Sequence, residues 1–190
     1  MSHKTHLILV KHSLPEIVEN IPAREWKLSV EGRKRARNLA ERLFQYKPEI
    51  LISSDELKAR ETAGIVGESL GLKYLVAAGL HEHDRSNSPF YDGLKFQVLV
   101  KKFFDKPEIL VFGRETANQA LSRFSKSIHS VIKFHNDKNI VVVSHGTVIS
   151  LFISQLTGTP GYDLWMELGL PSFVEIDMQS NSLLKIENII

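Results

Sequence analysis

The sequence predicts an α/β protein, a three-layer α/β/α sandwich with a mostly parallel central sheet. Short apolar runs rich in Val and Ile, typical of strands buried on both faces, occur at residues 7–10, 50–53 and 140–144. Segments with helical periodicity lie between these runs, and strands that alternate with helices form parallel sheets covered on both sides. The 190 residues contain no Pro-, Gly- or Ser-rich linker, so we expect one domain over residues 1–190.

The first half of the chain contains signals for two helices and a further strand. Ser29 can cap a helix whose apolar positions between residues 36 and 44 fall on one face. Residues 54–56 supply a cap and an acidic first turn for a second helix, which Gly71 ends. The apolar residues 72–76 then indicate a third strand.

The second half of the chain is irregular at first and strongly patterned later. Between residues 79 and 113 the pattern is loose, although aromatic residues at helical spacing occur within it. The elements expected from there on are a helix around residues 96–104, a long helix over 115–132, the strand at 140–144, an apolar helix over 148–156 and a hairpin of strands at 173–177 and 183–187.

Composition and charge exclude several classes of protein. The formal net charge of +2 is too weak for a nucleic-acid-binding surface, and the one basic cluster, residues 33–37, is expected on a solvated helix face. The chain has no cysteine, which excludes a disulfide scaffold and a thiolate zinc site. No apolar run approaches the ~18 residues that a membrane-spanning helix needs, and no signal-peptide core is present. We therefore expect a cytoplasmic protein that binds neither nucleic acid nor membrane.

Two histidines directly follow predicted strands. His12 comes just after the strand at 7–10, and His145 comes just after the strand at 140–144. In parallel α/β sheets, ligands bind beyond the carboxyl ends of the strands. The sequence therefore predicts that the two imidazoles lie together at one edge of the sheet.

Four motifs resemble, in order, the signatures of the histidine phosphatase superfamily, which has the phosphoglycerate-mutase-like fold. They read LILVKHS, SSDELKARETA, LHE and VVVSHG, and the resemblance extends from the first strand to the helix after His145. It implies that His12 attacks phosphorus and becomes a phosphohistidine, and that Glu82 protonates the leaving oxygen. It also implies that His145, followed by Gly146, helps to hold the phosphoryl oxygens.

The chain departs from the pattern of the family at three positions. The usual Arg-His-Gly reads Lys11-His12-Ser13, and Lys58 stands where the second motif normally has an arginine. Lysine keeps the positive charge but loses the two-toothed grip of a guanidinium on phosphate, so we expect weaker or retuned catalysis. The expected phosphate-binding residues are Lys11, Ser13, Lys58, His145 and Gly146.

The residue types themselves are suited to phosphoryl transfer. A neutral imidazole, with an ordinary pKa near ~6.5, has a free lone pair at neutral pH. Cations such as Lys11 and Lys58, together with N–H groups at helix starts, offset the charge of phosphate. A carboxylic acid, either Glu82 or Asp84 two residues later, can protonate the departing alkoxide. None of these steps requires a metal ion or another cofactor.

Three other interpretations of the sequence are less favoured. The HEHD segment, residues 81–84, would on a strand place its two histidines on one face, a spacing that allows zinc binding. Ser144-His145 suggests a serine hydrolase, but the G-x-S-x-G elbow is absent. Arg60 and Arg123 lie on predicted helices, where solvated ion pairs account for them.

The sequence therefore predicts a phosphoric monoester hydrolase that is independent of metals and acts through a phosphohistidine on His12. Mutases of the family insert a long segment between the acid and the second histidine. The region between Glu82 and His145 leaves little room for such a lid, so a phosphotransferase of the phosphoglycerate-mutase type is less favoured. The principal alternative is a phosphate-binding regulatory protein of the same fold that has lost turnover.

Substrate choice has no readable pattern in the sequence. The aromatic residues at 90–91 and in the FFDK segment, 103–106, are expected to cover part of the pocket and to influence specificity. A small phosphorylated metabolite and a phosphoprotein are both compatible with the motifs. The oligomeric state is not encoded in any pattern that we identify.

Overall fold

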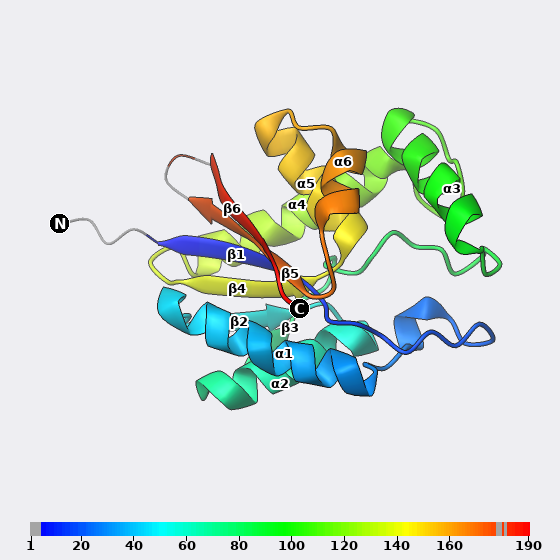
Figure 1. Ribbon diagram of the computed structural model, residues 1–190. Coiled ribbons are helices and arrows are strands. Elements are labelled where there is room, and N and C mark those ends of the chain that lie inside the picture. Colours follow the sequence, from blue (N-terminus) through cyan, green and yellow to red (C-terminus); the bar gives the residue numbers. More distant parts are fainter. Residues whose placement is uncertain (1–4, 178–179, 181) are drawn as a thin grey trace.

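The computed structural model describes residues 5–177, 180 and 182–190. The central feature of this part of the chain is a six-stranded sheet with the order β3-β2-β4-β1-β5-β6 (Figure 1). Its strands are β1 (His6–Lys11), β2 (Ile50–Ser53), β3 (Tyr74–Val76), β4 (Ile140–Ser144), β5 (Ser172–Asp177) and β6 (Ser182–Asn188). Strands β1 to β4 run parallel, whereas β5 and β6 form an antiparallel edge. The expected mostly parallel sheet is confirmed.

Strand β1 lies in the interior of the sheet, between β4 and β5. Its last residue, Lys11, pairs with Ser144 on one side and with Ser172 on the other. The four residues from Leu7 to Val10 are almost completely buried, as their apolar character predicts. Because the parallel strands end at a common edge, the residues that follow β1, β2 and β4 are brought together there.

Helices cover both faces of the sheet and complete the three expected layers (Figure 1). One side carries α1 (Val30–Leu43) and α2 (Leu57–Leu70), and the other carries α3 (Gly93–Asp105), α4 (Ala117–Phe134), α5 (Gly146–Thr157) and α6 (Gly161–Glu167). Two short 3-10 helices, η1 (Ala23–Glu25) and η2 (Phe44–Tyr46), complete the described helical elements. Alternate residues of β1 enter opposite cores, since Ile8 belongs to the cluster with α1 and α2, and Leu9 to the cluster with α4 and α5.

The element ends follow local capping more closely than hydrophobic pattern. Ser29 caps α1 as predicted, and its Oγ accepts the N–H of Gly32 at 2.9 Å. Helix α4 begins after Thr116, which forms a capping box with Gln119, and not at Glu115 as the apolar spacing suggested. The third strand is shorter than predicted, and α6 is an additional helix. None of the described helices is both long and apolar enough to span a membrane.

Candidate active site

The imidazoles of His12 and His145 lie side by side at the carboxyl edge of the sheet. His12 follows β1, and its backbone N–H donates to Ser144 O at 3.0 Å, which extends the pairing of β1 with β4 by one residue. His145 follows β4 and is the N-cap residue of α5. The ring centroids are 5.2 Å apart with an interplanar angle of 63°. The parallel strand order thus produces the predicted meeting of two histidines from distant parts of the chain.

The His12 ring is held in a single neutral form. Its Nδ1 lies 2.8 Å from Ser13 O, and because a carbonyl oxygen only accepts, Nδ1 must carry the hydrogen. The pKa of His12 lies well below its ordinary value because the ring is buried and because Lys58 and His145 lie nearby. The imidazole is therefore neutral at pH 7, and its Nε2 keeps a free lone pair.

The His145 ring is completely buried and is also neutral. Burial lowers its pKa to about 4, although the nearby carboxylate of Glu56 acts in the opposite direction. Its Nε2 lies 2.8 Å from Ser54 Oγ, in the turn that follows β2. This contact fixes the ring beside His12, so the two histidines form one rigid pair.

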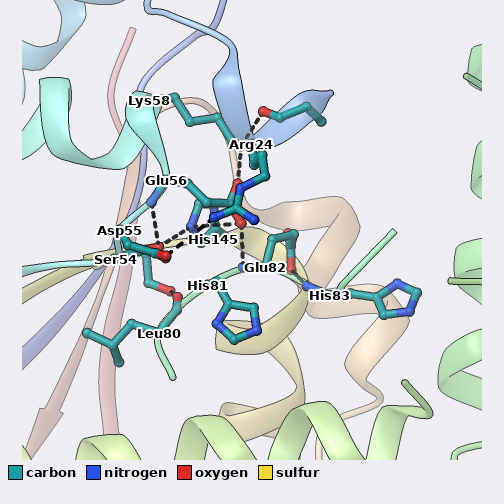
Figure 2. Close-up of polar contacts among 12 residues, drawn as sticks. Arg24, Ser54, Asp55, Glu56, Lys58, Leu80, His81, Glu82, His83 and His145 are labelled. Atoms are coloured by element: carbon teal, nitrogen blue, oxygen red, sulfur yellow. Dashed lines mark hydrogen bonds and ion pairs between the residues drawn. The ribbon is translucent and has the colours of Figure 1, made fainter. Parts of the chain in front are cut away.

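Glu56 is the residue of the site whose role the sequence did not indicate. Its carboxylate accepts hydrogen bonds from Lys58 Nζ and from the backbone N–H of Glu82, the latter at 2.8 Å (Figure 2). Its Oε1 also lies 3.7 Å from His145 Nε2. Burial alone would raise the pKa of Glu56, but His145 and Lys58 outweigh it and hold this pKa well below the usual range.

The sequence pattern assigned Glu56 only to the acidic first turn of α2. In the structure it is the N-cap residue, and its side chain makes no capping hydrogen bond. It turns toward the site instead, so the signal that could have identified it is a carboxylate two residues before Lys58 at the end of a buried strand.

The two lysines of the motifs lie beside the histidines, Lys58 buried and Lys11 partly buried, and both ammonium groups already have partners. Lys58 Nζ donates to Ala23 O at 2.8 Å as well as to Glu56. Lys11 Nζ donates to Leu168 O at 2.6 Å. Burial lowers the pKa of Lys11 to about 8, an effect that the negative charge of Glu82 partly offsets.

Gly146 allows the side chain of Lys11 to cross the start of α5. A Cβ atom at this position would lie 3.0 Å from Lys11 Cε and 3.3 Å from its Nζ. A larger residue would therefore push the ammonium group aside. The structure gives Gly146 this steric role, next to the N-terminus of α5.

The Glu82 carboxylate is aimed at the start of α5. One of its oxygens accepts the N–H of Thr147 at 3.1 Å, and the other accepts the N–H of His83 at 2.9 Å. Burial acts to raise the pKa of Glu82, but His145, Arg85 and the two N–H groups lower it overall. The carboxyl group is therefore ionised when the site holds no anion.

Asp84, the alternative acid, is committed to a local turn. Its Oδ1 accepts the N–H of Ser86 at 2.9 Å, and its own N–H donates to Glu115 Oε1 at 3.0 Å. Of the two carboxylates in this segment, the fold directs Glu82 toward the histidines and α5.

Ser13 does not present a donor to the site. Its N–H donates to Thr62 Oγ1 at 3.0 Å, and its hydroxyl donates to Gly32 O at 2.6 Å. Both groups serve the packing of the loop after β1 against α1 and α2, because a serine here can satisfy two buried partners. This geometry does not support the expected contact of Ser13 with phosphate.

The geometry assumed for a zinc site in residues 81–84 is absent. This segment is a loop and not a strand, and the rings of His81 and His83 point in different directions (Figure 2). His83 is buried with its ring centroid 4.2 Å from that of Phe103 and 4.7 Å from that of Phe112. Across the described residues, no group of three or more His, Asp or Glu side chains is arranged to hold a metal ion.

Arg123 fastens the loop that carries Glu82, and its predicted role as a solvated ion pair is wrong. Its side chain is only 19% exposed, and its guanidinium donates to Gly79 O and His81 O, both at 2.9 Å. It also pairs with Glu115 at 2.6 Å. The periodicity of the helix predicts that Arg123 faces solvent. It does not reveal that an irregular loop folds over this face and covers the side chain. Arg60, by contrast, is exposed on α2 as expected.

A pocket of about 740 Å³ opens beside Glu56 and Glu82. Its walls come from the loop over residues 17–26 and from the segment over residues 81–96. The aromatic residues among its lining are Trp26, Phe90, Tyr91 and Phe96. The prediction that residues 90–91 cover the pocket is therefore confirmed, whereas Phe103 of the FFDK segment is completely buried in the core.

The fold, the ordered motifs and the paired histidines define one class of protein. The family model described as the histidine phosphatase superfamily (branch 1) matches residues 7–186, which is nearly the whole chain. The chain belongs to this superfamily.

Individual relatives are distant in sequence. The uncharacterized phosphatase PhoE of Bacillus subtilis is 22% identical over 131 residues, which span 69% of this chain and 65% of that protein, slightly less than two thirds of its length. A mycobacterial glucosyl-3-phosphoglycerate phosphatase has a TM-score of 0.77 at 19% identity, with 97% of each chain covered. A phosphoserine phosphatase of Entamoeba histolytica, a mutant solved with phosphoserine, has the same TM-score and identity over 96% of each chain. At these identities the structural comparisons establish the fold.

Proposed function

We propose that the protein hydrolyses phosphomonoesters through a phosphohistidine formed on His12, without a metal ion or another cofactor. The observation that carries the proposal is the state of His12. Its Nδ1–H is tied to Ser13 O, so the neutral ring has its Nε2 lone pair available beside His145. A neutral nitrogen nucleophile close to buried cations is the arrangement that attack on an anionic phosphoryl group requires.

The reaction consists of two displacements at phosphorus. In the first, His12 Nε2 forms a bond to phosphorus, the bond from phosphorus to the ester oxygen breaks, and Glu82 gives its proton to the departing alcohol. In the second, Glu82 removes a proton from a water molecule that attacks phosphorus, and the bond between phosphorus and Nε2 breaks. Inorganic phosphate leaves, and both side chains return to their starting states.

The proton on Glu82 enters together with the substrate. The pKa of this carboxyl is lowered in the free protein, so it is ionised at neutral pH. A phosphate anion placed beside it adds a like charge and raises its pKa, which favours the protonated form that the first displacement needs. Lys11 and Lys58, with the N-terminus of α5, offset the charge of the phosphoryl oxygens, and the neutral ring of His145 helps to hold them.

Hydrolysis is favoured over transfer to a second substrate. Between Glu82 and His145 the chain forms α3 and α4, which contribute Val100, Phe103, Phe124 and Ile128 to the main core. These helices are committed to packing, and the pocket beside Glu82 opens at the surface. Water from this pocket can therefore reach Glu82, the group that takes a proton from it in the second displacement.

The substrate class that the pocket supports is a small phosphorylated metabolite. Its volume of about 740 Å³ lies within the range of roughly 300–1,000 Å³ that is common for small-molecule sites. The names of two structural relatives, a glucosyl-3-phosphoglycerate phosphatase and a phosphoserine phosphatase, refer to substrates of this size. A folded phosphoprotein would have to present its phosphate on an extended loop.

A release assay for inorganic phosphate over a panel of phosphorylated metabolites and p-nitrophenyl phosphate tests the function. We expect turnover by the wild-type protein and none above background for His12→Ala. Rapid quench in alkaline detergent during turnover should also trap a phosphate label on the protein that is stable in base and lost in acid, as a phosphohistidine is. A wild-type protein as inert as His12→Ala, but stabilised against heat by phosphate, would overturn the proposal.

An inert protein that still binds phosphate would be a regulatory protein of the same fold. One observation favours this alternative. Lys58, a cation assigned to the phosphate, is already neutralised by Glu56. The positive charge available to the substrate is therefore smaller than the motifs suggest.

A further inference from the structure

The Glu56 carboxylate is surrounded by the groups that a phosphoryl oxygen would seek. Lys58 supplies a cation, the backbone of Glu82 supplies an N–H at 2.8 Å, and Nε2 of His145 lies 3.7 Å away (Figure 2). These three come from α2, the loop after β3 and the end of β4. A cation, an oriented N–H and an imidazole in one place form an anion-binding site, and an anion of the protein itself occupies it.

The position of Glu56 relative to the pocket supports this assignment. Glu56 is one of the residues that line the pocket, and the lining does not include His12 or His145. Both rings are instead buried behind the pocket wall, with His12 only 7% exposed and His145 not exposed at all. The carboxylate therefore lies between the open pocket and the histidine pair.

We infer that Glu56 fills the phosphate-binding site of the resting protein, and that the phosphoryl group of a substrate must displace its carboxylate from Lys58 and from the N–H of Glu82. This inference depends on the proposed function for the position of the phosphate, but it does not depend on turnover. Glu56 thus weakens the binding of every phosphate ligand by competing for the same donors.

The cost of displacing Glu56 is common to all phosphate ligands, so only ligands that make further contacts in the pocket bind tightly, and esters can do so where free inorganic phosphate cannot. An ester has a leaving group that can contact Trp26, Tyr91 and Phe96 in the pocket, and this contact helps to offset the loss of the Glu56 contacts. Inorganic phosphate has no such group. The product is therefore released readily, and the protein resists inhibition by phosphate.

The test compares the affinity of inorganic phosphate for wild type and Glu56→Gln, measured by isothermal titration calorimetry and by the phosphate-dependent shift in melting temperature. The amide keeps the size of the side chain and removes its charge, so we expect the Kd for phosphate to fall by about tenfold or more. Asp55→Asn is the matched control. Asp55 also lines the pocket, but it pairs with Arg24 at 3.6 Å, so its replacement should change this Kd by less than about twofold.

A Kd that is unchanged or raised in folded Glu56→Gln would overturn the inference, and so would an equal gain in Asp55→Asn. If the unpaired Lys58 prevents Glu56→Gln from folding, Glu56→Asp provides the second test. The shorter side chain keeps the charge but cannot reach Lys58 and the N–H of Glu82 together, so phosphate should bind more tightly than to wild type. Failure of that gain would also reject the inference. Because these measurements use binding alone, they remain decisive even if His12 proves to have no catalytic role.

Discussion

At the scale of single residues, Glu82 and Asp84 stand two positions apart, yet their carboxylates have different surroundings. Glu82 contacts the start of α5 through the N–H of Thr147, whereas Asp84 accepts the N–H of Ser86 within its own turn. A proton donor has to lie where the leaving oxygen is released, and the start of α5 is next to His145. The geometry therefore favours Glu82 as the acid.

Glu82→Gln should slow the hydrolysis of alkyl phosphates far more than that of p-nitrophenyl phosphate. Loss of a general acid costs roughly 10²–10⁴ in rate for a poor leaving group, whereas p-nitrophenolate departs without a proton. We expect kcat/KM to fall by about 100-fold or more for the alkyl ester and by less than about tenfold for the aryl ester. Steady-state kinetics with both substrates measure the difference. Asp84→Asn should keep the wild-type ratio, and a selective loss in that variant would transfer the role to Asp84.

The positions of the site residues could be predicted from the sequence better than the directions of their side chains. Strand ends and helix starts fix where the backbone of Lys11 and Lys58 lies. The ammonium groups point where distant carbonyls accept them, Leu168 O for Lys11 at a separation of 157 residues and Ala23 O for Lys58 at 35. A flexible four-carbon stem follows such partners, and no local pattern reveals them. Glu56 escaped prediction for the same reason.

At the scale of elements, α4 positions the loop that carries Glu82, and it does so through Arg123. The guanidinium donates to Gly79 O, to His81 O and, at 3.3 Å, to Glu82 O, so one side chain holds three carbonyl groups of an irregular segment. This loop has no strand or helix of its own to hold it. The rigidity of Glu82 therefore comes from a helix on the other side of the loop.

Arg123→Lys should make the position of the Glu82 carboxyl group less fixed without removing this group from the site. A single ammonium cannot reproduce the forked contacts, and hydrogen bonds to charged groups contribute about 1.5–3 kcal/mol each, so we expect a loss of about 2 kcal/mol in the free energy of unfolding. The kcat for alkyl phosphates should fall by about tenfold, with p-nitrophenyl phosphate less affected, because the defect lies in proton donation. Urea unfolding and kinetics measure the two effects. Arg60→Lys, on the exposed side of α2, should change neither, and an equal loss for both substrates would argue against a positioning role.

The helices and strands could be predicted from the periodicity of apolar residues, but the conformation of the loop over residues 79–92 could not. Buried strands such as β4 and amphipathic helices such as α1 are determined by residues a few positions apart. The loop depends on single long-range contacts, among them Arg123 with Gly79 O and His81 O, and Ser127 Oγ with O of Ala78, the residue before the loop. Such contacts leave no periodic pattern in the sequence. The sequence therefore predicted a solvated Arg123, which the structure contradicts.

At the scale of the whole molecule, three buried histidines make stability depend on pH. Burial lowers the pKa of His12, His83 and His145 below the ordinary value of 6.5, in the case of His145 to about 4. Below pH 6.5 these histidines therefore bind more protons in the unfolded chain than in the folded protein. The free energy of unfolding falls as the pH drops through this range.

Between pH 7.0 and 5.5, His145 alone should contribute a loss of about 1 kcal/mol to the free energy of unfolding. This window stays above the ordinary pKa of 4.5 for glutamate, so the carboxylates Glu56 and Glu82, whose folded pKa values are lowered, contribute mainly at lower pH. Urea unfolding at several pH values measures the slope. His145→Gln should show a shallower slope than wild type, and His129→Gln, at an exposed position, should not. Equal slopes for wild type and His145→Gln would contradict the assignment.

Activity should be unaffected by chelation. The proposed displacements use the lone pair of His12, the proton of Glu82 and the charges of two lysines. We expect the same rate before and after dialysis against EDTA, with no stoichiometric zinc by elemental analysis. A loss of activity on chelation that added zinc restores would reject metal independence and return attention to residues 81–84.

The interior place of β1 has a consequence for biosynthesis. Its last residue, Lys11, directly precedes His12, yet the strands on either side of it, Ile140–Ser144 and Ser172–Asp177, are translated much later. While the ribosome is still working, its apolar residues have no sheet to join. The apolar residues of β1 can therefore be buried only after β4 and β5 have been made, which slows folding and leaves these residues open to aggregation until then.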